Sequence, residues 1–271
     1  MKRLIVTADD FGISKEVNEA VETAHRNGIL TATSLMVGEP FADDAVQRAR
    51  DLPTLGVGLH LALSRAHPVC SPKQIPGLVD RSGLLPAGLV AAGFRFFFRA
   101  DIRRQLQLEI TAQFEAFART NLALDHVNAH NHLHLHPTVL SLILTIGKKF
   151  GMKSIRLPKA ELAKGWGAKL LIPWLALMKF RLEKHDIRYN DILLGLDQTG
   201  MLDTKTLISM INRLSDHTVE LMCHPATGPW PGMDPAASTF RHDQEFLALI
   251  DDATVKAVHD NGIKLIAYKD I

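Results

Sequence analysis

The densest reactive chemistry in this sequence is a row of histidines between Asn128 and Pro137, which reads NAHNHLHLHP. Histidines occupy positions 130, 132, 134 and 136, and His126 lies just upstream. Residues two apart share a face of an extended chain, so the spacing predicts four imidazoles on one side. Neutral imidazole is a common ligand of divalent metals. The row therefore indicates a metal site, and the alternative is a polar loop that binds nothing.

Other residues with suitable chemistry occur singly or in pairs along the chain. Asp9 and Asp10 are adjacent, His60 ends the run LGVGLH, Arg156 follows KSI, and His224 follows ELMC. One carboxylate and two imidazoles around a divalent ion leave positions for water and substrate, as in hydrolytic metal sites. The second carboxylate is then free to act as a base, and His224 to protonate a leaving group.

Each of these residues also has a purely structural interpretation. The two aspartates could cap a helix, a lone histidine could be a satisfied core residue, and Arg156 could pair with a surface acid. Together they are harder to explain as scaffolding, because clustered carboxylates and imidazoles are costly to bury without a neutralising cation.

The sequence lacks the signature motifs of several enzyme classes. No HExxH, GxSxG, P-loop or GxGxxG motif occurs, which argues against that type of zinc protease, a serine hydrolase, an NTPase and a dinucleotide enzyme. Cys223 lies beside His224, but a cysteine that closes an apolar strand is more often buried and inert than nucleophilic.

Short apolar runs alternate with helical patterns along the chain, which predicts βαβ units and a parallel sheet. The expected strands are 4–7, 31–37, 55–61, 124–128, 153–157, 219–223 and 264–268. The expected helices are 14–26, 42–50, 102–121, 137–150, 204–214 and 244–261, with Ser14 as an N-cap and Gly28 as a stop. The candidate residues fall at strand C-terminal ends, where α/β folds bind ligands. We therefore expect one α/β domain over 1–271, a distorted TIM-like (β/α) barrel with parallel strands.

Composition limits the function classes. A hydrophobic content of 46% in 271 residues supports a substantial core, and a formal charge of +2 gives no long-range attraction to nucleic acid. Two cysteines form no disulfide framework and fit a reducing compartment. The first apolar run ends at Asp9, too early for a signal peptide or a membrane span. We expect a soluble cytoplasmic protein.

Two apolar insertions, near 84–100 and 163–182, depart from a compact barrel. They contain GLVAAGFRFFFR and WGAKLLIPWLALMKF, and both combine large apolar side chains with Arg or Lys, as interfacial segments do. They are too short to span a bilayer, and Pro173 interrupts the second. One hypothesis is an apolar wall that receives a lipid tail, with peripheral contact at the inner membrane surface. The alternative is a pair of ordinary helices buried against the core.

Five motifs together carry a family resemblance. They are TADDFG at 7–12, GLHL at 58–61, HNHLH at 130–134, IRLP at 155–158 and ELMCHP at 220–225, and Arg241 and Glu245 near the end fit the same series. In this order they resemble the YdjC-like carbohydrate deacetylases, which include chitooligosaccharide deacetylase. The resemblance implies a distorted barrel and metal-dependent removal of acetyl from an N-acetylated sugar.

Carried onto this chain, the resemblance implies one divalent metal ion. Its ligands would be Asp10, His60 and His130. Which of His130, His132 and His134 is the ligand stays open, because His130 and His134 have the same parity and could exchange roles. Zinc or magnesium is the expected ion, with cobalt, manganese and nickel as alternatives.

The same resemblance implies the remaining roles. Asp9 would be the base, His224 the acid, and Arg156 would orient the base or the substrate. His132, His134 and Arg241 are expected to contact substrate.

The histidine row is most similar to the hopanoid-biosynthesis branch of that family, for which the implied substrate is an N-acetylglucosaminyl lipid. Asn128 departs from the aspartate that many relatives have before the row, which removes a negative charge near the site. A homodimer is a further expectation. The alternatives are another metal-dependent hydrolase such as a phosphodiesterase, which would want more cations, and a non-catalytic glycolipid-binding protein, which needs no paired aspartates.

Overall fold

Strand β1 (Arg3–Phe11) is the central strand of the computed structural model, which describes residues 1–159 and 166–271. Its side chains are buried on both faces, as expected for an apolar run in a parallel sheet covered by helices. It pairs in parallel with β2 (Ala32–Leu35) on one edge and β6 (Thr218–Cys223) on the other.

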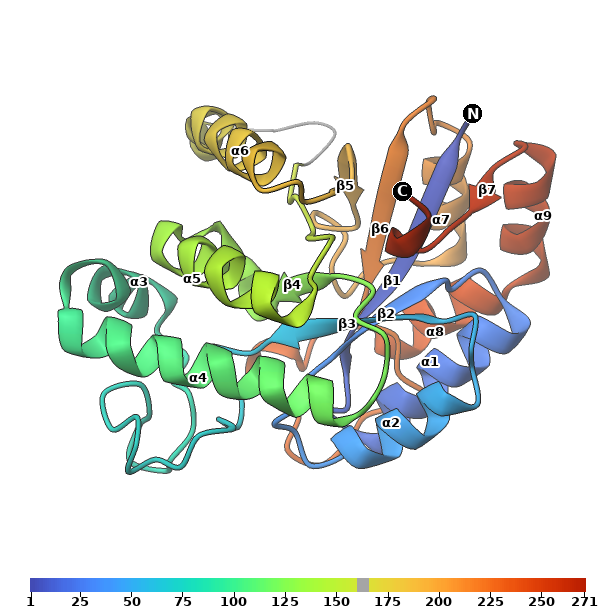
Figure 1. Cartoon of the computed structure of the whole chain (residues 1–271). Helices are drawn as coiled ribbons and strands as arrows, with labels where there is room; N and C mark the ends of the chain where they lie inside the picture. Colours follow the sequence, from blue (N-terminus) through green and yellow to red (C-terminus); the bar gives the residue numbers. More distant parts are fainter. Residues whose placement is uncertain (160–165) are drawn as a thin grey trace.

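The sheet is parallel throughout, in the order β4-β3-β2-β1-β6-β5, and β7 also pairs with the start of β1. The remaining strands are β3 (Gly56–Leu61), β4 (Val127–Ala129), β5 (Ile192–Leu194) and β7 (Lys264–Leu265). The strands curve into a half-barrel with helices around it (Figure 1), which confirms the expected α/β single domain with parallel strands.

The strand predicted over 153–157 forms only isolated parallel bridges, between Val127 and Ile155 and between Ser154 and Arg188. The side-chain oxygen of Asn190 accepts a hydrogen bond from the Leu157 amide (2.8 Å), and its amide nitrogen donates to the Leu157 carbonyl (3.0 Å). A side chain therefore takes the place of a strand partner there. The short strand β5 was not predicted, because three apolar residues carry no periodic signal.

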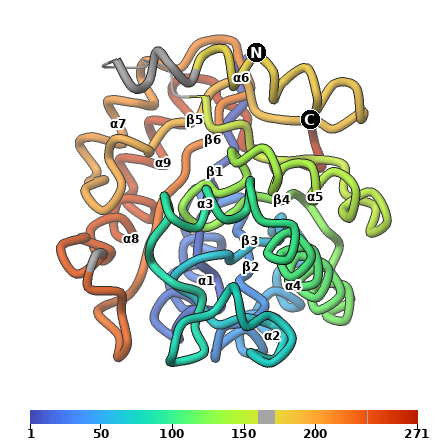
Figure 2. The backbone as a smooth tube through the Cα atoms, turned by 90° about the vertical axis from the view of Figure 1, so that its left-hand side faces the viewer, coloured from blue at the N-terminus to red at the C-terminus, as the bar shows by residue number. Residues whose placement is uncertain are grey.

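Helices cover the sheet on two sides. They are α1 (Lys15–Asn27), α2 (Ala42–Arg50), α3 (Leu89–Phe98), α4 (Ala100–Arg119), α5 (Pro137–Gly147), α6 (Trp166–Lys184), α7 (Thr204–Ile211), α8 (His242–Ile250) and α9 (Asp252–Asp260). α3, α4 and α5 pack together on one side of the strands, and α7, α8 and α9 lie on the other (Figure 2).

Helix ends follow the local sequence. The Ser14 hydroxyl accepts a hydrogen bond from the Val17 amide, and α1 stops before Gly28, both as predicted. The single helix predicted over 244–261 is instead two, because Asp251 is extended (φ −66°, ψ 129°) and its carboxylate caps α9 through the Ala253 amide.

The two apolar insertions contain α3 and most of α6, although residues 163–165 of the second lie outside the described residues. Within 1–159 and 166–271, no helix has the length and apolar character needed to cross a membrane.

Candidate metal centre

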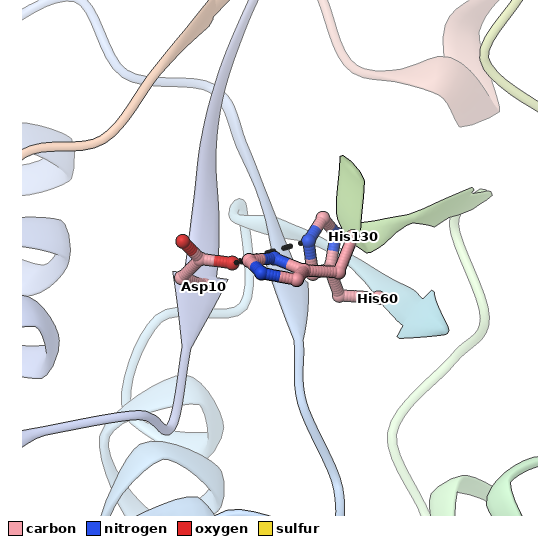
Figure 3. Close-up of side chains that lie close together, drawn as sticks. All are labelled: Asp10, His60 and His130. Carbon is pink, nitrogen blue, oxygen red and sulfur yellow. Dashed lines mark hydrogen bonds and ion pairs between the residues drawn. The ribbon is translucent and has the colours of Figure 1, made fainter. Parts of the chain in front are cut away.

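Three side chains from separate strand ends meet beside β1 (Figure 3). Asp10 comes from the end of β1, His60 from the end of β3, and His130 directly follows β4. The Asp10 Oδ1 atom lies 3.1 Å from His60 Nε2 and 3.0 Å from His130 Nδ1. One donor atom from each residue lies within 4.8 Å of the others, so the trio could hold one metal ion.

The histidine row is not extended, so the expectation of four imidazoles on one face is wrong. Residues His130–Leu135 form a 3₁₀ turn in which Asn131 and His132 adopt left-handed backbone angles (φ 54° and 53°). Left-handed geometry at two residues turns each side chain in a different direction. His130 therefore reaches Asp10, while His132 lines the pocket that the trio also borders and His134 is fully buried.

The hydrogen bonds around His60 fix its tautomer. The amide nitrogen of Asn128 donates to Asp9 Oδ1 (3.0 Å) and to the Ser34 hydroxyl (3.2 Å), so the amide oxygen faces His60 Nδ1 at 2.6 Å. That oxygen can only accept, and His60 Nδ1 must therefore carry a proton. In neutral His60 the lone pair on Nε2 then points at the Asp10 carboxylate, an arrangement of two acceptors that a cation would stabilise. The donor set thus fits a divalent metal ion.

The hydrogen bonds of Asn128 show why an asparagine suits this position. It donates through its nitrogen and accepts through its oxygen at the same time, which an ionised carboxylate cannot do. The residue orients His60 and Asp9 together without adding a negative charge beside them.

Asp9 is held by a fully buried ion-pair network. Arg156 Nη1 donates to Asp9 Oδ2 (2.6 Å) and Nη2 to Oδ1 (2.9 Å), while Arg156 Nε and Nη2 donate to Glu220 Oε1 (3.0 and 2.8 Å). Burial alone would raise the pKa of Asp9, but Arg156 and the nearby His60 hold this pKa well below its usual range. Asp9 therefore stays ionised, and Oδ2 keeps one lone pair that no other donor occupies among the described residues.

Glu220 is itself anchored by side chains far away in sequence. The Tyr268 hydroxyl donates to Glu220 Oε2 (2.6 Å) and the Thr7 hydroxyl to Oε1 (2.8 Å). Sequence reasoning missed this layer, although a lone acid within the buried strand TVELMC signalled that a partner must exist.

His224 directly follows β6 and borders the same pocket as the trio. Its backbone amide donates to Glu245 Oε2 (2.6 Å), and its carbonyl oxygen lies 2.6 Å from His242 Nδ1. The side-chain atom Nδ1 of His224 is buried and has no hydrogen-bond partner among the residues that the structure describes. The backbone of this residue is therefore fixed by α8 while its ring stays uncommitted. His242 is a further supporting residue that the sequence did not reveal.

These groups border one pocket of about 360 Å³. Its polar lining includes Asp9, Asp10, His60, His130, His132 and His224. The apolar part of its wall is formed by Ile13, Leu89, Leu196, Met222, Trp230 and Phe240. Reactive polar groups thus lie in a pocket with a mainly apolar wall, the usual form of a small-ligand site.

The remaining expected residues lie outside this lining. Arg156 is fully buried behind Asp9, and Arg241 is exposed at the start of α8. His134 is buried, and neither of its ring nitrogens has a partner within 1–159 and 166–271. His126 stacks on Tyr268, with ring centroids 4.5 Å apart, away from the trio. Arg156 is thus placed to orient Asp9 rather than a ligand.

The pKa values of the histidines in the row 130–136 are shifted in different directions. Burial acts to lower the pKa of His130, but the Asp10 carboxylate raises it above its usual value. Burial and Arg156 lower the pKa of His132 to about 3, so that imidazole is neutral near pH 7. The Asp10 carboxyl, for which burial is opposed by His130 and His60, has a pKa well below its usual range.

The fold and the site together define a parallel α/β half-barrel with a hydrolase-type Asp-His-His cluster at the strand ends. The model of the family described as YdjC-like protein matches residues 3–260, so the chain belongs to the YdjC-like family.

The sequence matches to relatives cover nearly the whole chain. The carbohydrate deacetylase of Geobacillus stearothermophilus is 32% identical over 268 residues, which cover 98% of this chain and 96% of that protein. The carbohydrate deacetylase of Brevibacillus brevis is 28% identical over 273 residues, which cover 99% of each. Among solved structures, the "putative cellobiose-phosphate cleavage protein" of Enterococcus faecalis V583 is 25% identical with a TM-score of 0.78, covering 99% of this chain and 98% of that one.

Proposed function

We propose that this protein is a metal-dependent carbohydrate N-deacetylase, which hydrolyses the acetamide of an N-acetylated amino sugar to acetate and a free amine. The observation that carries the proposal is the convergence of Asp10, His60 and His130, with Asp9 and His224 bordering the same pocket. The names of the relatives and the family match support the carbohydrate substrate.

Asp10 Oδ1, His60 Nε2 and His130 Nδ1 would hold the metal ion. When bound, the ion supplies Lewis-acid polarisation of the acetyl carbonyl and lowers the pKa of water. His60 is presented for this by Asn128, and the turn after β4 presents His130.

Asp9 is the base of the proposed mechanism. Asp9 borders the pocket, and its Oδ2 atom, whose one partner among the described residues is Arg156, would accept a proton from the attacking water. A carboxylate with so low a pKa is a weak base, so Arg156 serves mainly to orient it and to keep it ionised.

His224 is the acid. An amide nitrogen leaves poorly until it is protonated, and His224 borders the same pocket as Asp9, with no hydrogen bond to its Nδ1 among the described residues. It donates its proton to the departing sugar nitrogen, and the C–N bond then breaks.

The arginines near the pocket are already paired with carboxylates, which favours hydrolysis of an acetyl group over hydrolysis of a phosphate ester. Arg156 is committed to Asp9 and Glu220, and Arg65 pairs with Asp234 through one nitrogen at 2.7 and 2.9 Å. A phosphodiesterase needs cationic groups free to meet the phosphate oxygens.

For the substrate, we propose an N-acetylglucosaminyl lipid of the hopanoid type, processed in the cytoplasm at the inner membrane surface. Support comes from the apolar pocket wall and from α3, whose first residue Leu89 lines that wall and whose outer face is apolar. His132, His134 and Arg241 as substrate contacts, and a homodimer, remain predictions.

The test is product analysis with purified, metal-loaded protein. Chitooligosaccharides and an N-acetylglucosaminyl lipid are incubated separately, and mass spectrometry follows the loss of one acetyl group while an enzymatic assay measures acetate. The expected result is acetate release that stops with a chelator and returns with added metal. Phosphate release from a phosphodiester panel, or an unchanged sugar after long incubation, would overturn the proposal.

A further inference from the structure

Helix α3 exposes large apolar side chains where a surface helix normally carries polar ones. Its exposed large side chains are Val90, Phe94, Phe97 and Phe98, which are 76%, 63%, 49% and 71% exposed. They lie at positions i, i+4, i+7 and i+8 and therefore form one stripe along the helix. The opposite side is apolar too, because Ala92 and Phe96 are buried against the protein. A helix that buries one apolar face and exposes a second lacks a partner on the outside.

Basic side chains border this apolar stripe. Arg95 lies within α3, and Arg99, Arg103 and Arg104 follow it at the start of α4. Asp101 is the one acid in the stretch 84–108, and it pairs with Arg99 (2.6 Å). Among the described residues, neither Arg95 nor Arg104 has a carboxylate partner. The stretch thus carries four positive charges against one negative.

An open groove of about 460 Å³ joins the two kinds of surface. Phe97, Arg103 and Arg104 line it from α3 and α4, and Thr138 and Ser141 line it from α5. Arg103 Nη1 donates to the carbonyl oxygen of Phe97 (2.6 Å), which ties the start of α4 to the end of α3. The groove places guanidinium groups and hydroxyls beside an exposed ring, the combination that meets a lipid headgroup above acyl chains.

Charge decides between two occupants of this surface. In a symmetric dimer the same patch meets itself, which would bring two sets of unpaired arginines together. An anionic bilayer instead offers negative headgroups to the arginines and an apolar interior to the phenylalanines.

We propose that α3 and the start of α4 form a docking surface for anionic lipid bilayers. Phe94, Phe97 and Phe98 insert at the headgroup boundary while Arg95 and Arg104 contact lipid phosphates. α3 lies at the outer edge of the molecule beside α4 and α5 (Figure 1), and its first residue, Leu89, lines the candidate pocket. Docking therefore brings the pocket close to the membrane surface. This binding does not depend on the proposed deacetylase activity.

The test is co-sedimentation of the full chain with vesicles of phosphatidylcholine alone or with about one-third phosphatidylglycerol. The protein should bind the anionic vesicles, bind neutral ones far more weakly, and dissociate as salt rises. The double variants Phe94→Ser/Phe98→Ser and Arg95→Glu/Arg104→Glu should each bind about tenfold more weakly or worse. Thermal unfolding checks that each variant is folded.

Matched controls change exposed residues elsewhere. Leu247→Ser removes an exposed apolar side chain from α8, and Arg213→Glu reverses an exposed charge after α7. Both should bind anionic vesicles like the unmodified chain. Absence of binding to anionic vesicles, or equal losses in the controls, would overturn the proposal. Sedimentation that shows a dimer broken by Phe94→Ser/Phe98→Ser, without vesicle binding, would assign the surface to a second copy instead.

Discussion

The ion-pair network behind the candidate pocket and the outer face of α3 are opposite in both charge and burial. In the first, Asp9, Arg156 and Glu220 are charged and buried; in the second, Phe94 and Phe98 are apolar and exposed. The buried charges persist because each one meets an opposite charge inside the same chain. Within the described residues the exposed rings of Phe94, Phe97 and Phe98 contact mainly one another, which is typical of an interaction surface. Buried charges that are paired within the chain indicate that reactive groups are being held in position. Exposed apolar rings that the chain does not cover indicate an interaction surface.

The largest expected effect concerns the metal trio. Asp10→Asn should lose bound metal and reduce acetate release by about 10³-fold or more, because Lewis-acid stabilisation is worth several kcal/mol. Asn is the better variant than Ala because Asp10 has a left-handed backbone (φ 64°), which Asn tolerates. Elemental analysis measures the metal. Full metal content with full turnover in this variant would remove Asp10 from the site.

Removal of the Arg156 cation tests the buried ion-pair network. Arg156→Met leaves Asp9 and Glu220 as unpaired buried carboxylates, so the free energy of unfolding should fall by about 3–5 kcal/mol. Urea unfolding measures it. Arg213→Met, at an exposed position, should change stability by less than about 0.5 kcal/mol. If the two variants lose the same amount, the buried network has no special role in stability.

The acid of the mechanism should have a more selective effect. His224→Gln should bind metal normally yet reduce turnover by about 10²-fold, the usual scale for a positioned general acid. Since Glu245 and His242 hold the backbone of residue 224, the variant should remain folded. Parallel metal analysis and acetate assays separate this result from loss of the metal, and unchanged turnover would reject the role.

The free energy of unfolding should fall as the pH is lowered, because Asp9 is ionised in the folded protein. The folded pKa of Asp9 lies below its unfolded value, so Asp9 contributes stability above about pH 4 that is lost as pH falls toward the folded pKa. The loss should be smaller than in Arg156→Met, because Glu220 keeps its partner. Urea unfolding between about pH 7 and pH 3 should show a flatter acid limb in Asp9→Asn than in the unmodified chain. Identical limbs would contradict the assigned shift.

The smallest expected effect is on the outer face of α3. Phe98→Ser should change the free energy of unfolding by no more than about 0.5 kcal/mol, because the ring is 71% exposed. Phe96→Ser, on the buried face of the same helix, is the matched variant and should cost about 3 kcal/mol or more. Equal losses at both positions would show that the outward stripe is packed within the protein.

The pattern of the sequence was sufficient to place Asp9, Asp10, His60 and His224 at the strand ends, because parallel strands bring their C-terminal ends to one edge. The N-cap of α1 at Ser14 and the start of α2 at Ala42 were also predictable, since capping and periodicity are local. Strand 153–157 was over-predicted, because the sequence does not show that the Asn190 side chain would occupy its edge.

Local sequence therefore determined the residue types of the site, the order of its elements and the parallel class of the sheet, all of which depend on neighbours within a few residues. The tertiary structure alone decided which histidine of the row reaches Asp10, since that depends on two left-handed residues held by their surroundings. It also decided that Glu220 and Tyr268 support Asp9 through Arg156, and which of the two apolar faces of α3 points outward. Contacts between residues tens to hundreds of positions apart set these features, and no local pattern records them.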